Sequence, residues 1–158
     1  MSYYVDDKLN AYPWAKTVKV MNPLSVDLGV MRQSILFGGL ESLARNINRK
    51  NSNLKFFEFG NTYCYDEASR TEEAPIKAYK QFYHLGLWVT GNHVQGSWIH
   101  EDVKSSVYEL KAYVLNVLRR LGLSAGEIVE DKSDNNIFAH ALVLRTRNGK
   151  KLAEYGVL

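Results

Sequence analysis

Few side chains in this sequence have the type and spacing that chemistry requires, and the single cysteine is the first of them. Cys64 lies between Tyr63 and Tyr65 in a strand-like run. A nucleophilic thiolate would need a neighbouring base and positively charged surroundings, which this run does not supply, so we interpret Cys64 as structural. One cysteine also excludes a disulfide within the chain and argues against a cysteine-based zinc site.

The other potential metal ligands are histidines and a short acidic segment. The four histidines, at positions 84, 93, 100 and 140, lack the short spacing of zinc ligands. The segment 131–136 resembles part of a calcium-binding loop but lacks its glycine and its closing glutamate; its candidate ligands are Asp131, Asp134, Asn135 and Asn136. A solvated turn is the favoured interpretation, and the sequence predicts no metal site.

Glu58 is the charge whose position is most costly, because it lies between Phe57 and Phe59. One interpretation is a buried carboxylate paired with Arg32 or Arg49, which we favour. The other is a remnant of a ligand site.

Cationic side chains could form a surface for a nucleic acid, but no aromatic residues interleave with them. An ordinary solvated face is therefore favoured for this set, which comprises Arg45, Arg49, Lys50, Arg119, Arg120, Arg145, Arg147, Lys150 and Lys151.

A turn, a helix and a strand follow one another between residues 22 and 66 and would position Glu58 and Cys64. Pro23 is excluded from a helix interior, and Ser25 and Asp27 can cap a helix that begins a few residues later. The helix should stop at residues 51–53, and the alternating run Leu54–Phe59 predicts a strand that continues past a bend at Gly60. Spacings of four, three and four place these apolar side chains on one helix face: Leu36, Leu40, Leu43 and Ile47.

The rest of the chain predicts more strands and one long helix. We expect a helix over 101–121, with apolar residues at 103, 107, 110, 114, 117 and 121, and a short helix over 2–9. Strands are expected at 17–21, 82–90, 138–146 and 152–157, with an Asn148-Gly149 hairpin turn, a surface loop after Asp66 and an acidic turn at 130–136. This pattern predicts one α+β domain over 1–158, an antiparallel sheet flanked by helices.

Composition adds few limits. The net charge of +3 neither requires nor excludes a nucleic-acid partner, and 46% apolar content suffices for one core. We expect no membrane span and no secretion signal, which together with the lone cysteine fits the cytoplasm. Because the pattern predicts that both ends lie inside a sheet, we expect the chain to be cut from a longer polypeptide.

The run from Asn22 to Asp66 closely resembles the catalytic-like module of the beta subunit of bacterial phenylalanine tRNA ligase. It departs from the family pattern at Phe37, where Pro is usual, and at Gly39, where Leu is expected. A weaker likeness continues through Asp102, Val103 and Lys104, similar to a signature that opens the family's next helix, although Ser105 replaces a Gly. The matching residues are Asn22, Pro23, Leu24, Ser25, Met31, Arg32, Ser34, Ile35, Leu36, Gly38, Asn46 or Asn48 with Arg49, Phe57, Glu58, Phe59 and Gly60.

This resemblance implies a class II aminoacyl-tRNA synthetase-like fold with a degenerate site. In the family's catalytic subunit an Arg, two residues before a Glu, grips the alpha-phosphate of ATP. Aligned on Gly60 to Asp66, that Arg falls at Cys64 and the Glu at Asp66. Cysteine carries no cation and makes no bidentate phosphate contact, and the Gly-rich third motif of class II enzymes has no counterpart in the sequence.

The resemblance therefore implies an inactive structural module that supports an ATP-dependent ligase. The implied partners are the catalytic alpha subunit, in a heterotetramer of two alpha and two beta chains, and tRNA through that complex. ATP and Mg would belong to the complex, and none is expected here. Two alternatives are an active ligase domain with an altered phosphate grip and a free-standing α+β module that binds a small molecule or peptide.

Overall fold

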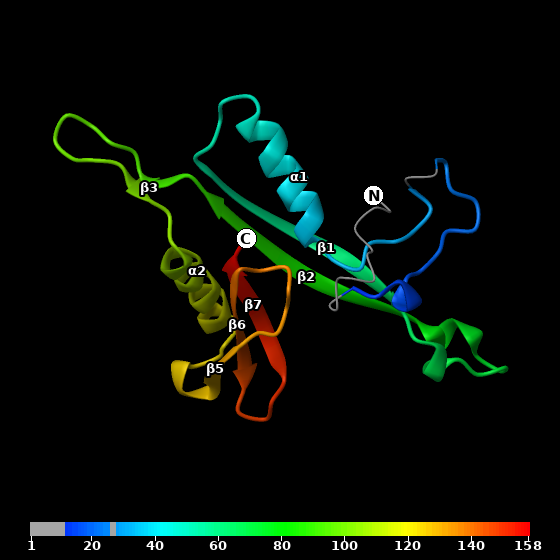
Figure 1. Cartoon of the computed structure of the whole chain (residues 1–158). Helices are drawn as coiled ribbons and strands as arrows, with labels where there is room; N and C mark the ends of the chain where they lie inside the picture. Colours follow the sequence, from blue (N-terminus) through cyan, green and yellow to red (C-terminus); the bar gives the residue numbers. More distant parts are fainter. Residues whose placement is uncertain (1–11, 26–27) are drawn as a thin grey trace. The chain divides into compact units, whose positions relative to one another are not determined.

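The computed structural model describes residues 12–25 and 28–158. Contacts between residues divide the chain into two compact units, Met1–Trp88 and Val89–Leu158 (Figure 1). Each unit has its own buried cluster, and the single domain predicted over 1–158 stays a prediction. The helix expected over 2–9 and the proposed cap Asp27 lie outside the described residues.

The described part of the first unit begins with irregular chain. A 3₁₀ turn, η1 (Trp14–Lys16), is followed by an isolated antiparallel bridge between Lys19 and Val30. The strand expected over 17–21 is thus reduced to one bridge. Ser25 does not cap the helix, which begins only at residue 36, where the Ser34 hydroxyl accepts a hydrogen bond from the Leu36 amide at 3.1 Å.

Helix α1 (Leu36–Ile47) packs its predicted apolar face on the hairpin that follows it. Leu36, Leu40 and Leu43 join the buried cluster, whereas Ile47 is exposed. The helix ends at Ile47, earlier than the expected stop at 51–53, because residues 48–50 form a turn that brings Lys50 to a positive φ of 64°. The core of this unit consists of Ile35, Leu43, Leu54 and Trp88.

Gly39, one of the departures from the family pattern, lies buried in α1 against the Trp88 indole. A Cβ at this position would overlap the indole ring. The helix runs without a break through Gly38 and Gly39, so the tandem glycines do not end it. Gly39 gives the large Trp88 ring the room that a leucine would take.

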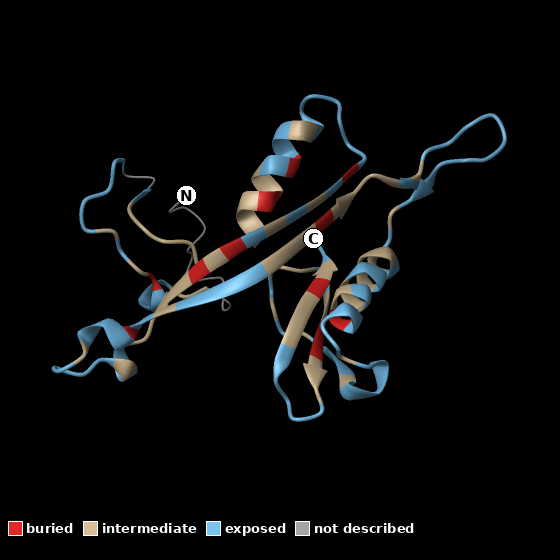
Figure 2. Cartoon of the chain, turned by 180° about the vertical axis from the view of Figure 1, so that it is seen from behind, coloured by how far each residue is buried: buried red, intermediate tan, exposed pale blue. Residues whose placement is uncertain are grey.

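Strands β1 (Leu54–Tyr65) and β2 (Tyr79–Thr90) form a long two-stranded hairpin (Figure 1). Ring contacts between Phe59 and Tyr83 and between Tyr65 and Tyr79 follow the antiparallel direction. More buried and more exposed residues alternate along much of β1 (Figure 2), as the predicted alternation requires. The expected surface loop between the strands contains two 3₁₀ turns, η3 (Glu67–Ser69) and η4 (Pro75–Ala78).

The second unit contains a small β-ribbon, a helix and a three-stranded sheet. Strands β3 (Asn92–Val94) and β4 (Val103–Lys104) pair antiparallel, and helix α2 (Val107–Arg120) follows. A 3₁₀ turn, η5 (Ala125–Glu127), leads into the antiparallel sheet β5-β6-β7. Its strands are β5 (Ile128–Lys132), β6 (His140–Thr146) and β7 (Lys151–Val157).

Two sequence predictions for this unit were wrong at their boundaries. The helix predicted from residue 101 starts at Val107, because Val103 and Lys104 pair with β3 instead. The acidic turn predicted at 130–136 begins with strand residues, since Glu130 and Asp131 pair with Leu144 and Val143. The Asn148-Gly149 hairpin is confirmed, with Gly149 at a φ of 80°.

The helix face of α2 also differs from the predicted stripe. Val107, Leu110 and Val114 pack on the core as expected. The next buried residue on the helix is Leu118, rather than the residue at the predicted position 117. Leu121 at the predicted end is 74% exposed. A stripe with a 3.5-residue repeat drifts around a straight helix of 3.6 residues per turn, so its last positions leave the core.

The α+β class is confirmed. The described residues form three small antiparallel sheets rather than one sheet. Neither described helix has the length and apolar composition needed to span a membrane.

Two carboxylates of the second unit are held by hydrogen bonds to cations and hydroxyls. Glu130 accepts from Lys111 Nζ at 2.5 Å and from the buried Tyr155 hydroxyl at 3.1 Å. The Lys111 contact lowers the pKa of Glu130, while burial, with the Glu130 contact, raises the pKa of Tyr155 to about 12. Burial opposes ionisation of Glu154, but hydrogen bonds from Lys151 and Ser133 outweigh it, so the pKa of Glu154 is lowered.

We predict that acid destabilises this unit through these carboxyls. Their folded pKa values lie below the ordinary value of 4.5, so the unfolded chain binds more protons in acid. The stabilisation is complete above about pH 5 and is lost as pH falls through the folded pKa values. Thermal unfolding followed by circular dichroism between pH 3 and 7 should show Tm falling below pH 5, and Glu154→Gln should make that fall smaller.

Asp134→Asn is the control for this prediction, because Asp134 is exposed on the chain between β5 and β6. This variant should retain the acid dependence of the wild type. An unchanged acid dependence in Glu154→Gln would show that the contacts of Glu154 do not stabilise the fold.

Candidate functional site

The Arg32 side chain lies across β1 and binds it at two points. Its Nη1 donates to Glu58 Oε1 at 2.7 Å and its Nε donates to the Asn61 carbonyl at 2.9 Å. The Arg32 carbonyl in turn accepts from the Tyr63 amide at 2.9 Å. Both charged side chains are about one-third exposed, at 34% and 35%. Of the two partners considered for Glu58, the structure selects Arg32.

Gly60 provides the space for this pair. A Cβ on Gly60 would overlap the Arg32 guanidinium and would lie 2.9 Å from Glu58 Oε1. Glycine at position 60 is therefore explained by the side chain that lies over it. Arg32, Glu58 and Gly60 together form one unit, which we call the Arg32 clamp.

Cys64 and Asp66, the two positions of the degenerate site, follow on the same strand and just beyond it. The Cys64 thiol is half-buried and contacts the Tyr65 carbonyl at 3.7 Å. The Asp66 carboxylate forms an ion pair with Lys80 and accepts from the Ser69 hydroxyl at 2.7 Å. The Lys80 ammonium, followed by the Ser69 hydroxyl, holds the pKa of Asp66 below its usual range.

Asp66 therefore acts as a structural anchor for the start of the segment between β1 and β2. Its carbonyl accepts from the Ser69 amide at 3.0 Å, and its amide donates to the Ala78 carbonyl at 2.8 Å. Ala78 is completely buried. The carboxylates Glu58 and Asp66 each have a cation of the same unit as partner.

The other residues of the family pattern do not gather at this place. Asn22 and Pro23 are exposed in the segment between the bridged residues Lys19 and Val30, and Arg49 is exposed just after α1. Gly38 lies within α1, where its carbonyl accepts from the Ser42 hydroxyl at 3.0 Å. Met31 is half-buried, and its amide donates to the Val18 carbonyl at 2.8 Å.

The structure brings no candidate metal ligands together in the part of the chain that it describes. No group of three or more His, Cys, Asp or Glu side chains there is arranged to hold an ion. In the segment 131–136, which we interpreted as a solvated turn, Asp131 Oδ2 lies 3.9 Å from Arg145 Nε. His93 Nδ1 lies 2.9 Å from Glu109 Oε1 on α2.

One feature that sequence reasoning missed is an exposed aromatic face on the β1-β2 hairpin. Phe57 is 70% exposed, Phe59 58% and Tyr83 70%. The rings touch one another: Phe59 stacks on Tyr83 with an interplanar angle of 8°, and Phe57 meets Phe59 edge to face. The sequence signal for this face was that aromatic residues occupy both even and odd positions of Leu54–Phe59. Side chains at even and odd positions lie on opposite faces of a strand, and only one of these faces can pack on α1.

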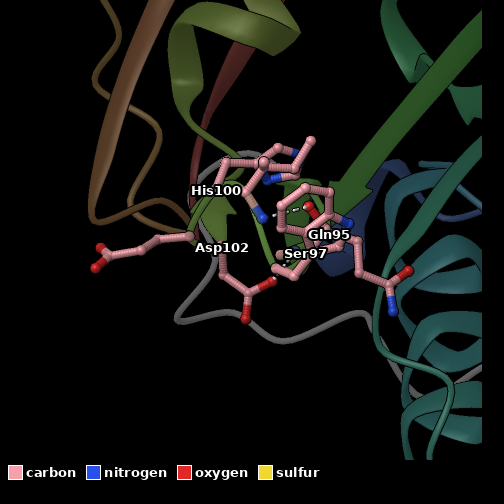
Figure 3. Close-up of a pocket in the computed structure, with 8 residues that line it drawn as sticks. Gln95, Ser97, His100 and Asp102 are labelled. Carbon is pink, nitrogen blue, oxygen red and sulfur yellow. Dashed lines mark hydrogen bonds between the residues drawn. The ribbon is translucent and has the colours of Figure 1, made fainter.

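A second missed feature is the loop of residues 95–102 between β3 and β4, which lines a shallow, open hollow of about 660 Å³ (Figure 3). The Asp102 carboxylate accepts from the Gly96 amide at 2.5 Å, and the Ser97 amide donates to the His100 carbonyl at 2.9 Å. Trp98 is 94% exposed and Ile99 is 70% exposed. The sequence signal was an apolar Trp-Ile pair within an otherwise polar run.

Comparison with known proteins shows which family the chain is similar to. The sequence model of the family described as "Phenylalanyl tRNA synthetase beta chain CLM domain" matches residues 1–158. The chain is 51% identical over 157 residues to a phenylalanine–tRNA ligase beta subunit of Bacteroides fragilis and 53% identical to that of Bacteroides thetaiotaomicron. The corresponding subunit of Porphyromonas gingivalis is 43% identical.

Each of these alignments covers 99% of this chain and 19% of the relative, so the chain spans about a fifth of the length of the curated relatives it matches. The resemblance noted on residues 22–66 thus extends over nearly the whole sequence. The chain belongs to the family of the phenylalanyl tRNA synthetase beta chain CLM domain.

Proposed function

We propose that this chain is a non-catalytic structural module of a phenylalanine tRNA ligase beta subunit. In this role it supports the ATP-dependent attachment of phenylalanine to its tRNA by an alpha/beta complex. The observation that carries the proposal is the state of the degenerate site. In the alignment that the resemblance implies, Cys64 takes the place of the phosphate-gripping Arg of the family's catalytic subunit; in the structure, Asp66 is bound to Lys80 and Ser69.

The chemistry of amino-acid activation explains why this state matters. A carboxylate attacks the alpha-phosphate of ATP, and the charge that develops in the transition state requires positioned cations. Arg32 is engaged by Glu58 and by the Asn61 carbonyl, and Lys80 is engaged by Asp66. Each of these cations would have to leave a carboxylate before it could meet a phosphate.

The remaining parts of the proposal concern the whole assembly. The module has a class II synthetase-like fold and pairs with the catalytic alpha subunit in a heterotetramer of two alpha and two beta chains. ATP and Mg belong to the catalytic subunit, tRNA is bound by the complex, and the complex works in the cytoplasm. Packing within such an assembly would account for the exposed rings of Phe57, Phe59 and Tyr83.

The two alternatives are less well supported. An active ligase domain would need a cation in place of Cys64. A free-standing binding module is not favoured by the comparisons, because the similarity extends over the whole chain and is to one domain of longer relatives.

We predict that the degenerate site is dispensable for catalysis. In a beta subunit that carries this module, assembled with its alpha subunit, Cys64→Ser and Asp66→Asn should leave phenylalanine-dependent ATP–pyrophosphate exchange within about twofold of wild type, since no transition-state contact is removed. Asp66→Asn should lower Tm, because it weakens the pairing with Lys80. Exchange is therefore measured well below Tm.

The positive control is replacement of the phosphate-gripping Arg of the alpha subunit by Ala, which should lower exchange by about a hundredfold or more. A comparable loss in Cys64→Ser or Asp66→Asn, with the complex assembled and exchange measured well below the Tm of each variant, would contradict a purely structural role.

A further inference from the structure

The loop of residues 95–102 is held in one shape by its own hydrogen bonds. The β3-β4 ribbon fixes its ends, through the pairs Asn92 with Lys104 and Val94 with Val103. The Asp102 carboxylate binds the Gly96 amide at 2.5 Å, and a Cβ on Gly96 would lie only 3.1 Å from the Asp102 amide nitrogen. Asp102, which opens the second, weaker run of family likeness, thus closes this loop instead of starting a helix.

Two large apolar side chains project from this ordered backbone. Trp98 is 94% exposed and Ile99 is 70% exposed, and they are adjacent in sequence. A short bridge between Ser97 and His100 flanks them on either side (Figure 3). A single exposed apolar residue needs no explanation, but an exposed tryptophan on a preformed loop is the kind of side chain that dominates binding in protein interfaces. Since the backbone is already ordered, little conformational entropy is lost when such a loop binds.

The charges of the loop distinguish between classes of partner. Residues 95–102 contain no lysine or arginine and include Glu101 and Asp102. Phosphate groups of nucleic acid would be repelled here, and so would an anionic lipid surface. An apolar pocket on a protein, with a neutral or basic rim, fits both the Trp-Ile pair and the adjacent carboxylates.

We propose that the 95–102 loop is a docking element whose Trp98 side chain enters an apolar pocket of the catalytic alpha subunit. This inference rests on the proposed function for its partner, and it adds the surface through which the module is recognised. Trp98 is the anchor, Ile99 extends the apolar contact, and Asp102 positions both residues by holding the loop closed.

The test measures binding of the purified chain to a purified phenylalanine tRNA ligase alpha subunit by isothermal titration calorimetry. Trp98→Ala should weaken binding by about thirtyfold or more, as loss of an anchoring tryptophan does. Tyr108→Ala is the matched control, because Tyr108 is an aromatic residue of the same unit and is 76% exposed on α2. It should change the dissociation constant by less than about threefold. Both variants should keep the wild-type Tm, since neither side chain is buried.

Fluorine NMR of the chain labelled with 5-fluorotryptophan gives a second readout, because the alpha subunit stays unlabelled. The Trp98 resonance, identified by its absence in Trp98→Phe, should shift and lose its solvent isotope effect on binding. The buried Trp88 is 6% exposed, and its resonance should keep the small isotope effect that it has in the free chain.

Three results separate the two proposals. A bound complex in which Trp98→Ala has wild-type affinity, or in which the Trp98 resonance stays solvent-exposed, would overturn the docking element and leave the proposed function intact. Absence of binding by the wild-type chain would overturn the alpha-subunit partner in both proposals. Weaker binding by Trp98→Ala, with Tyr108→Ala unaffected, supports both.

Discussion

Replacing Gly39 with leucine, the residue expected in the family pattern, will lower the free energy of unfolding of the first unit by about 3 kcal/mol or more. The Trp88 indole occupies the place of the new side chain, and even a Cβ would overlap it. Trp88 has little freedom to move, because it is 6% exposed and also lies against Gly86. The helix backbone and the indole must therefore separate, and the cluster with Leu43 and Leu54 opens.

Urea unfolding followed by circular dichroism at 222 nm measures this effect. Trp88→Ala alone should cost about 3–5 kcal/mol, since it leaves a large cavity. In the double variant the leucine fills part of that cavity, so its destabilisation should be smaller than the sum of the single effects by more than about 1 kcal/mol. Ala44→Leu is the control, because it adds leucine at an exposed position of the same helix; it should stay within about 0.5 kcal/mol of wild type. Additive single effects would show that Gly39 and Trp88 do not exclude each other.

Gly39 also illustrates what the sequence could not supply. Its departure from the family pattern is visible in the sequence, but the reason is a tryptophan 49 positions later that packs on it. Patterns set by near neighbours were predicted well, among them the α1 face, the alternation along β1 and the Asn148-Gly149 turn. Each of these depends on residues only a few positions apart.

Strand pairing between distant segments caused the main errors. Val103 continues an apolar helical repeat, yet it joins β4 because Val94 offers backbone partners. The sequence pattern predicts Asp131 in a turn, but in the structure Asp131 pairs with Val143 and belongs to β5. A short polar or mixed segment has no strand pattern of its own, so only the tertiary arrangement decides its state.

Part of the site was predictable in the same sense. The unfavourable position of Glu58 between two phenylalanines required a cation, and the sequence offered Arg32 or Arg49. The choice depends on the path of the chain before α1, which crosses β1 so that the Arg32 carbonyl accepts from the Tyr63 amide. The exposure of Phe57 and of Trp98 had no sequence signal of comparable strength, because exposure is a property of the folded chain.

The Arg32 clamp leads to a prediction in which the effect of one substitution changes sign with the background. In the wild type, Gly60→Ala should destabilise the first unit by about 1–3 kcal/mol, since the new methyl group displaces the Arg32 guanidinium. Arg32→Ala should cost about 2 kcal/mol, because the half-buried Glu58 carboxylate and the Asn61 carbonyl lose their donors. Part of that loss is recovered because both charges are about one-third exposed to solvent.

Two of the three atoms nearest to the new methyl group belong to Arg32, so in the Arg32→Ala background only Glu58 Oε1 remains of these three, and that side chain can turn toward solvent. Alanine restricts the unfolded chain more than glycine does, so Gly60→Ala in this background should stabilise the unit by about 0.5 kcal/mol. Urea unfolding of the four proteins of this cycle gives the coupling directly. If Gly60→Ala destabilises equally in both backgrounds, glycine is required there for a reason other than Arg32. If the Arg32 clamp only stabilises the fold, its variants should lower ATP–pyrophosphate exchange in the assembled ligase only in proportion to the folded protein that is lost. A fall in kcat larger than that loss would instead support the interpretation of Arg32 and Glu58 as part of a ligand site.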